Sequence, residues 1–249
     1  MTISKKELLN EFYGIGKSKA NLNFKKISLL AIFAGLFISF AAFSFVVVNT
    51  GMQSLNKTYA KFISAICFSF GLFAVVVSGA ELFTGNILML QALLKREISL
   101  KKVFRNWTLV YIFNFLGCIL TAVLIYFSGL LNSDMQKFLH NICIAKTTAP
   151  FLELIFRGIG CNIFVCLGVW MAFACKDGIS KFFSCMICII LFIICGFEHS
   201  VANMFYLFLS FMKNDITFIS IFYDLIPVTI GNILGGAVVA VGYYFIYED

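Results

Sequence analysis

Two copies of one polar pattern, Gly-x-Glu-x4-Asn, interrupt apolar stretches of this chain. The first copy is GAELFTGN at 79–86 and the second is GFEHSVAN at 196–203. Ionisable side chains inside long apolar segments are costly and usually mark functional positions. Glu81 and Glu198 are the only carboxylates in the two patterns. We expect each to accept hydrogen bonds from loop N–H groups and to hold a helix break in shape.

The two copies differ at the positions best suited to chemistry. Thr84 lies in the first copy and His199 in the second. An imidazole can carry or share a proton near neutral pH, and we expect His199 to line a pathway rather than to serve only as a buried structural histidine. Either Thr84 or Ser200 could cap the helix that restarts after its break.

Several amides also lie within the apolar stretches. For Asn86 and Asn114, hydrogen bonding between packed helices explains the amide at least as well as substrate contact does. Asn86 and Asn203, inside the patterns, are expected to help shape the breaks. Lys146, just before Pro150, either attracts anions to the mouth of a pathway or is an ordinary solvated loop lysine. The amides are Asn86, Asn114, Asn162, Asn203 and Asn232.

Bulky apolar residues flank both patterns. They could form hydrophobic constrictions that strip water from a permeant species, with ordinary core packing as the default explanation. These residues are Phe68, Leu72, Leu82, Phe83, Val165 and Phe192.

The composition predicts an integral membrane protein. Of 249 residues, 61% are hydrophobic and only 12% are charged, which leaves too little polar surface for a soluble domain. The long uncharged runs favour helices, because a membrane β-barrel would show short alternating segments. No cleavable signal peptide is expected, since residues 1–26 are polar and basic and the first apolar run is long enough to span the bilayer.

The apolar runs predict six membrane spans. A helix crosses the roughly 30 Å hydrocarbon core in about 20 residues. The regions 62–94 and 182–212 are each too long for one straight helix and too short for a hairpin. We therefore expect each of them to be one discontinuous helix. Four other runs predict simple spans: from about Ile27, from about Asn106, over 151–175 and over 225–247.

The basic residues predict the orientation. Thirteen of the nineteen Lys and Arg residues lie in the N-terminal segment and in the loops after the second and fourth spans. By the positive-inside rule both termini are expected in the cytoplasm, which explains the net charge of +7 without a nucleic-acid partner. Residues 1–26 would form a cytoplasmic segment with an interfacial amphipathic helix over 5–20, and residues 27–249 the membrane domain.

The sequence also divides into two related halves. Asn114 follows the first pattern's asparagine by 28 residues and Asn232 follows the second pattern's by 29, and each begins an Asn-x-Leu-Gly motif. Three spans per half, over about 27–133 and about 148–247, require the second half to be inverted in the membrane. Inverted repeats with broken helices place their site near the midplane, where the free N–H groups of a restarted helix favour an anion.

At these residues the sequence resembles the formate/nitrite transporter family. The likeness extends from the first span to the sixth, and the string GFEHSVANMF at 196–205 is its most specific part. Within the family the chain is most similar to the hydrosulfide-channel branch. The other segments that carry the likeness are 79–86, 105–114, 157–172 and 227–236.

The resemblance implies an all-α, aquaporin-like fold without an Asn-Pro-Ala box, and a homopentamer in the inner (plasma) membrane with one pore per subunit. It implies two apolar constrictions, one formed by Phe68, Leu72 and Phe192 and the other by Leu82, Phe83 and Val165. It also implies a central histidine, a loop threonine, a vestibule lysine and polar partners, which map to His199, Thr84, Lys146, Asn162 and Asn232.

We therefore expect a passive channel for small monovalent anions, foremost hydrosulfide, with formate, nitrite and chloride as further candidates. Proton-coupled formate/nitrite transport is the alternative within the family. Two other classes stay open: a neutral-solute channel, and a membrane thiol oxidoreductase that uses Cys185 and Cys188, although this CxxC lies mid-run without a βαβ context. No enzymatic activity, metal or cofactor is expected, and the chain has no nucleotide-binding loop for ATP-driven pumping.

Overall fold

The computed structural model describes residues 3–52 and 56–248. Residues 1–2, 53–55 and 249 of the two segments predicted above lie outside this described part. Within it the structure is helical throughout, and six helices are long and apolar enough to cross a membrane, as predicted. They are α2 (Phe24–Gly51), α3 (Lys57–Ser78), α5 (Leu100–Phe127), α7 (Phe151–Ala174), α8 (Gly178–Cys195) and α10 (Phe218–Tyr247).

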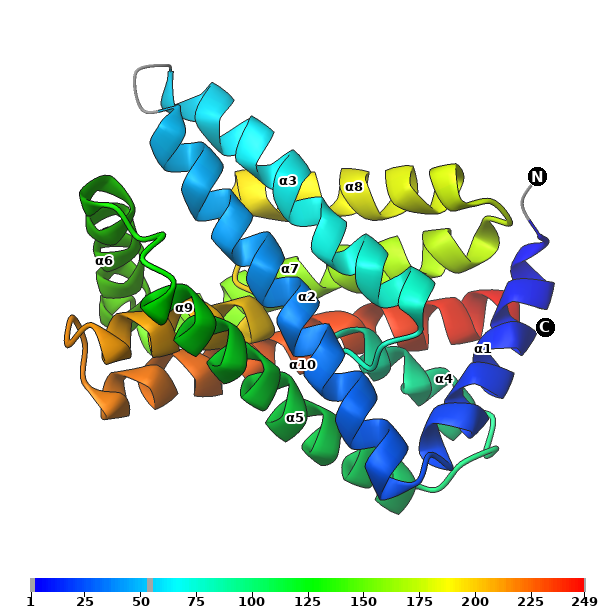
Figure 1. The fold of residues 1–249 in the computed structure, drawn as a ribbon. Helices are drawn as coiled ribbons and strands as arrows, with labels where there is room; N and C mark the ends of the chain where they lie inside the picture. The colour runs from blue at the N-terminus through cyan, green and yellow to red at the C-terminus, as the bar shows by residue number, and fades with distance from the viewer. Residues whose placement is uncertain (1–2, 53–55, 249) are drawn as a thin grey trace.

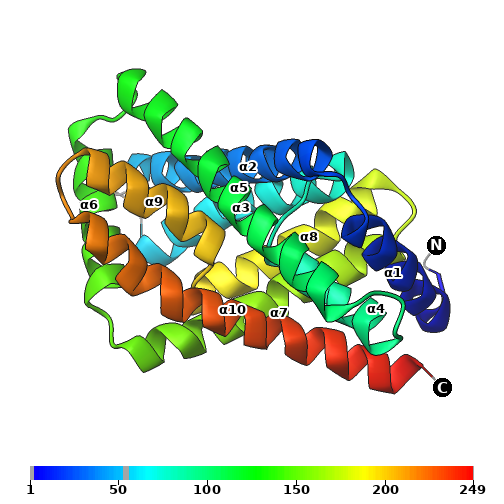
Figure 2. The same ribbon diagram turned by 90° about the horizontal axis from the view of Figure 1, so that it is seen from below.

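Shorter helices complete the two ends of the molecule. The predicted N-terminal helix is present as α1, which lies beside α4 and the end of α10, whereas α6 lies at the opposite end (Figures 1 and 2). A loop was expected where α6 stands. A helix forms there because the Asn132 side chain caps it by accepting from the Met135 N–H. The shorter helices are α1 (Lys5–Ala20), η1 (Gly85–Met89), α4 (Leu90–Leu94), α6 (Ser133–Thr148) and α9 (Ser200–Met212).

Both predicted discontinuous helices are present. The first half-helices, α3 and α8, end at Gly79 (φ +71°) and Gly196 (φ +76°), a left-handed conformation that glycine adopts without strain. After the first break the chain restarts as the short 3₁₀ helix η1 followed by α4, whereas after the second it restarts as the thirteen-residue α9. The two breaks therefore begin in the same way, at a left-handed glycine, but they are followed by different kinds of helix.

The outer spans of each half cross at glycines. In the first half α2 and α5 meet where a Cβ on Gly35 would lie 2.2 Å from the Asn114 carbonyl oxygen. In the second half α7 and α10 meet where a Cβ on Gly231 would lie 2.2 Å from the Ile155 carbonyl oxygen. Small residues let helix backbones approach closely in a membrane. The two crossings hold each broken span between a pair of continuous ones.

Two spans begin earlier than the sequence predicted. Helix α5 begins at Leu100 rather than near Asn106, and α10 begins at Phe218 rather than at Leu225. The Thr217 side chain caps α10 by accepting from the Ser220 N–H. Helix geometry extends beyond the uncharged run in both cases, because the first turn of a span need not be buried in hydrocarbon.

We expect the substitution Gly35→Ala to lower the free energy of unfolding by about 1–3 kcal/mol, because the added methyl overpacks the α2–α5 crossing. Gly242→Ala is the control, since a Cβ there meets nothing within 4 Å. Thermal unfolding of the purified protein in detergent measures the difference. Equal melting temperatures for the Gly35 variant and the wild type would contradict the crossing as described.

Candidate permeation pathway

Three cavities lie in a row between the two ends of the molecule. The α6 vestibule, about 170 Å³, has Lys61, Lys146, Glu198 and His199 among its lining residues. The central chamber, about 10 Å³, is lined by apolar side chains and His199. The α1 vestibule, about 70 Å³, lies under α1 and includes Lys19. Together they trace a path with a lysine in the lining of each outer cavity and a narrow, largely apolar chamber between them.

Apolar side chains separate the three cavities. Phe68 and Phe192 line both the α6 vestibule and the central chamber, with ring centroids 6.1 Å apart at 87°. Leu72 and Leu82 line both the central chamber and the α1 vestibule. The structure thus pairs Leu72 with Leu82, whereas the resemblance grouped Leu72 with the two phenylalanines. Val165 lines the central chamber.

Phe83 points away from this path. Its ring centroid lies 4.9 Å from that of Tyr111 and 6.3 Å from that of Trp107, both on α5. It does not line any of the three cavities as the described residues define them. The structure therefore places Phe83 in packing against α5 instead of in a constriction.

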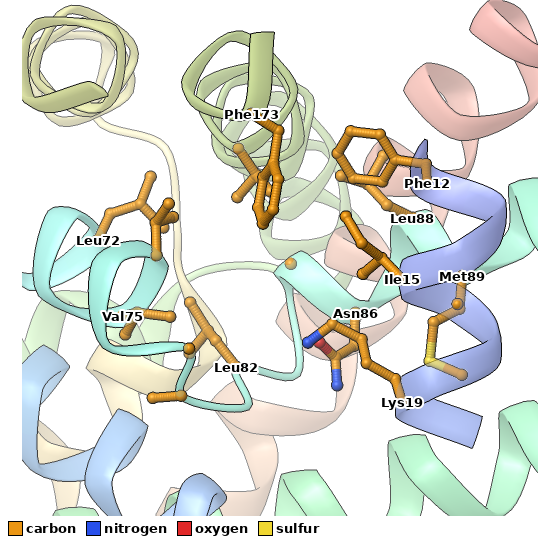
Figure 3. A pocket seen from close by; sticks show the side chains of 16 residues that line it. Phe12, Ile15, Lys19, Leu72, Val75, Leu82, Asn86, Leu88, Met89 and Phe173 are labelled. Atoms are coloured by element: carbon orange, nitrogen blue, oxygen red, sulfur yellow. The ribbon is translucent and has the colours of Figure 1, made fainter. Parts of the chain in front are cut away.

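Helix α1 closes the α1 vestibule from one side. Figure 3 shows Phe12, Ile15 and Lys19 of α1 facing Leu82 of the first break and Asn86 of η1. The Phe12 ring stacks on the ring of Trp170, 4.9 Å between centroids, which anchors α1 to α7.

A second contact ties α1 to the end of the last span. Glu248, which follows α10, accepts from Tyr13 of α1 and from Lys95, which follows α4. These two hydrogen bonds hold the pKa of Glu248 below its usual value. Helix α1 is therefore attached both to α7 and to the end of α10.

His199 lies at the junction of the α6 vestibule and the central chamber. Its Nδ1 accepts from the Ala202 N–H at 3.2 Å, which makes His199 the N-cap of α9. Since Nδ1 is an acceptor, the ring proton of a neutral imidazole sits on Nε2 and is donated to Thr84 Oγ1 at 2.9 Å. The expected caps were wrong: Thr84 makes no capping bond, and Ser200 Oγ has no partner among the described residues.

Asn114 and Asn232 clamp the two breaks in the same way. Asn114 accepts from the Phe83 N–H at 2.9 Å and donates to two backbone carbonyls, one of them at Glu81. Asn232 accepts from the Ser200 N–H at 2.9 Å and donates to two carbonyls, one at Glu198. Both N–H donors of each amide are used. Asn232, expected on the pathway, is thus fully engaged by backbone, as is Asn114.

Asn162 supports the first break from α7. Its Nδ2 donates to the carbonyl of Thr84 at 3.2 Å and to that of Asn232 at 2.6 Å. Neither Asn162 nor Thr84 lines any of the three cavities within the described part of the chain. Thr84 is connected to the cavities through its hydrogen bond to the His199 ring, and Asn162 holds the Thr84 carbonyl.

Each break carboxylate is paired with a lysine from outside its own span. Glu81 accepts from Lys19 at 2.6 Å and from Asn86 at 2.6 Å. Glu198 accepts from Lys146 and, at 2.9 Å, from Asn203. The expectation that loop N–H groups supply these bonds was wrong, because side chains supply them and the backbone N–H groups of both glutamates donate to carbonyls of α2 and α7.

Three residues of these clusters were not predicted from the sequence. Lys19 is the ion-pair partner of Glu81, and no sequence pattern links two residues so far apart along the chain. Asn106 receives a hydrogen bond from Asn86 at 2.9 Å, and Asp224 receives one from Asn203 at 2.8 Å. Both precede their clamping asparagine by eight residues in the sequence. That shared offset is the signal that could have identified them.

Comparisons with known proteins agree with this geometry. The sequence model described as formate/nitrite transporter matches residues 6–246. The chain is 34% identical over 256 residues to the formate channel FocA of Escherichia coli (strain K12), with 93% of this chain and 90% of the relative covered. A solved structure described as an FNT family ion channel superposes with a TM-score of 0.87 at 28% identity, covering 96% of this chain and 98% of that one. Another, described as a pentameric formate channel with formate bound, gives 0.78 at 32% identity, covering 91% and 98%.

We expect Asn114→Ala and Asn232→Ala each to lower the free energy of unfolding by about 3 kcal/mol, because each change leaves a buried N–H and a buried carbonyl of the break without the asparagine that binds them. The matched control is Asn141→Ala, at an exposed position of α6. Chemical denaturation in detergent measures the effect. The two substitutions should lower the free energy of unfolding by similar amounts. An unchanged free energy of unfolding in either variant would contradict the clamping role.

Proposed function

Because this chain belongs to the formate/nitrite transporter family, we propose that it is a passive membrane channel for small monovalent anions. The observation that carries the proposal is the order of groups along the path. A lysine stands at each mouth, and a narrow apolar chamber with one imidazole N–H donor lies between them. The family to which the chain belongs is one of transporters, in keeping with a role in transport and not in catalysis.

The lysines at the mouths would raise the local anion concentration. Lys61 and Lys146 both line the α6 vestibule, and Lys19 lines the α1 vestibule. Positive charge inside a low-dielectric funnel concentrates anions and speeds their entry. Lys146 and Lys19 are each ion-paired with a break glutamate, so each attracts an anion without trapping it.

The central chamber would select for small, weakly hydrated anions. A fully charged ion pays a large desolvation cost in an apolar constriction unless donors replace its water. His199 lines the chamber, and its Nε2–H, which Thr84 holds in place, would be the donor that replaces this water. The anion would take the Nε2–H from Thr84 as it passes, while the cap on α9 keeps the ring fixed.

Within this class we propose hydrosulfide as the preferred anion. A chamber of about 10 Å³ between apolar rings suits a compact, polarisable ion that loses its water readily. Formate is the second candidate, supported by the formate channel among the relatives and by the formate-bound structure. Nitrite and chloride are further candidates. Proton-coupled formate/nitrite transport is the alternative mechanism.

We also propose the assembly and location that the relatives suggest. The protein would form a homopentamer with one path per subunit, since the similar formate-bound channel is described as pentameric. We place the protein in the inner membrane of the cell. The excess of Lys and Arg in the N-terminal segment and in the loops after the second and fourth spans supports an orientation with both termini in the cytoplasm. Residues 1–26 would then form the cytoplasmic segment that closes the α1 vestibule, and residues 27–249 the pore domain.

The deciding experiment measures flux of hydrosulfide, formate, nitrite and chloride into proteoliposomes, with and without a pH gradient. We expect saturating, gradient-driven flux that Lys146→Glu reduces by about tenfold, because the charge at the mouth is reversed. Lys137→Glu, on the exposed face of the same helix, should leave flux unchanged.

Flux that follows an imposed pH gradient would favour the symport alternative. Water or glycerol flux insensitive to Lys146→Glu would favour a neutral-solute channel. A thiol oxidoreductase activity lost in Cys185→Ser, with pore flux intact, would favour that class instead; Cys185 and Cys188 are both buried in α8.

We expect His199→Asn to reduce anion flux by about tenfold or more while keeping a melting temperature close to that of the wild type. Asparagine can still cap α9 but does not supply the Nε2–H donor, which is worth more than about 1.5 kcal/mol to a charged partner. His199→Ala should lose both flux and stability. Undiminished flux in a folded His199→Asn protein would show that the imidazole donor is not used.

A further inference from the structure

The two lysine–glutamate clusters match each other in all but one residue. In each, a break glutamate binds a lysine and the asparagine five residues later. That asparagine then donates to a third side chain of the last span of its half, which is Asn106 in the first half and Asp224 in the second. An amide in one cluster is thus replaced by a carboxyl in the other.

The second carboxyl oxygen of Asp224 stands where the matching residue of the first cluster, Asn106, has an N–H donor. In the first half, Asn106 Oδ1 accepts from Asn86, and Asn106 Nδ2 donates to the Lys19 carbonyl at 3.3 Å and toward Glu81 at 3.5 Å. In the second half, Asp224 Oδ1 accepts in the same way, but Oδ2 has no hydrogen-bond partner among the described residues. Asp224 is 0% exposed.

The surroundings supply little to stabilise a second negative charge. The cation that faces Asp224 is Lys146 of α6, and it is already paired with Glu198. The other titratable groups facing it are Cys143 of α6 and Tyr111 of α5. On α7, Arg157 pairs with Glu153 at the surface. Two carboxylates that share one buried cation repel each other, so a cluster with both of them ionised is costly.

Lys61 acts on the same vestibule from α3. It lies near Glu198, and its Nζ donates to the Ile194 carbonyl at 3.0 Å. Uptake of a proton by Asp224 removes one negative charge from the cluster that it forms with Asn203, Glu198 and Lys146 beside this vestibule.

Asp224 does not line the α6 vestibule as the described residues define it, but it is hydrogen-bonded to Asn203, which does. We propose that Asp224 is a proton-binding site directly behind this vestibule, and that its protonated form, with the Oδ2–H in the donor position of its counterpart Asn106, is the form that favours anion entry. Uptake transfers one proton from a hydronium ion of the solvent to the carboxylate, and release returns it to water, so that one O–H bond breaks as another forms. The ionised form adds one negative charge beside Lys146 and opposes anion entry. The inference rests on the proposed anion channel and deepens it.

The test compares Asp224→Asn, which gives the second cluster the residue of the first, with the wild type. Formate flux is measured in proteoliposomes at equal pH on both sides, between about pH 6 and about pH 8, where an ordinary carboxylate stays ionised. We expect wild-type flux to fall by about threefold or more over this range, and Asp224→Asn to lose this fall and retain the higher rate. The control Asp134→Asn, exposed on α6, should behave as the wild type does.

A second measurement does not depend on flux. Infrared difference spectra recorded across the same pH range should show a protonated-carboxyl band in the wild type that Asp224→Asn lacks. The reverse variant, Asn106→Asp, should gain such a band and a second pH-dependent component of flux. If Asp224→Asn does not fold as an oligomer, the Asn106→Asp variant alone is sufficient to test the proposal.

The outcomes are separable. A pH profile and a carboxyl band that both persist in Asp224→Asn would overturn the proton-binding site while leaving the channel intact. Wild-type protein that conducts no anion at any pH would overturn the proposed function, and the infrared band would still decide whether Asp224 binds a proton.

Discussion

The constraint on which the rest of this structure depends is that backbone outside a helix must find hydrogen-bond partners when it lies at membrane depth. The two breaks meet it with one side chain each. Asn114 and Asn232 use both amide N–H groups and the carbonyl oxygen on the backbone of the break and of a neighbouring span. The glycine crossings bring those spans close enough for the short asparagine side chain to reach. The close packing of the spans and the hydrogen bonding of the breaks therefore depend on each other, and both halves repeat this arrangement.

On this symmetric scaffold the chemistry is asymmetric. The first break restarts as a short 3₁₀ helix without a side-chain cap, whereas the second restarts as α9, capped by His199. The side chain that caps the second break also reaches Thr84 of the first. A single hydrogen bond thus joins the two breaks at the central chamber. The side chains shared by both halves stabilise the breaks, and those that differ between the halves face the path or its charged clusters.

The sequence predicted the six spans, both breaks and the repeat, because these follow from hydropathy and from glycine, glutamate and asparagine at fixed offsets. It did not predict which groups complete each cluster. The Lys19–Glu81 pair joins residues 62 positions apart, and hydropathy carries no information about such a contact. Nor did it predict that Phe83 faces α5 while Leu82 faces the path, since side-chain direction in a non-helical segment follows no period. The helix α6 was missed because its apolar residues are few, although its cap was visible as Asn132.

The capping of α9 by His199 also affects which group can bind an additional proton. If His199 were to gain a second proton, Nδ1 would become a donor facing the Ala202 N–H, and the cap would be lost. Protonation of this ring therefore carries a structural cost at the centre of the path, in addition to the cost of a buried charge. A proton on Asp224 Oδ2 would break no hydrogen bond, because Oδ2 has no partner among the described residues, and it would place a donor where Asn106 has one in the matching cluster. On the two proposals the tasks are separate: His199 would be the fixed neutral donor in the chamber, and Asp224 would be the titratable group behind the α6 vestibule.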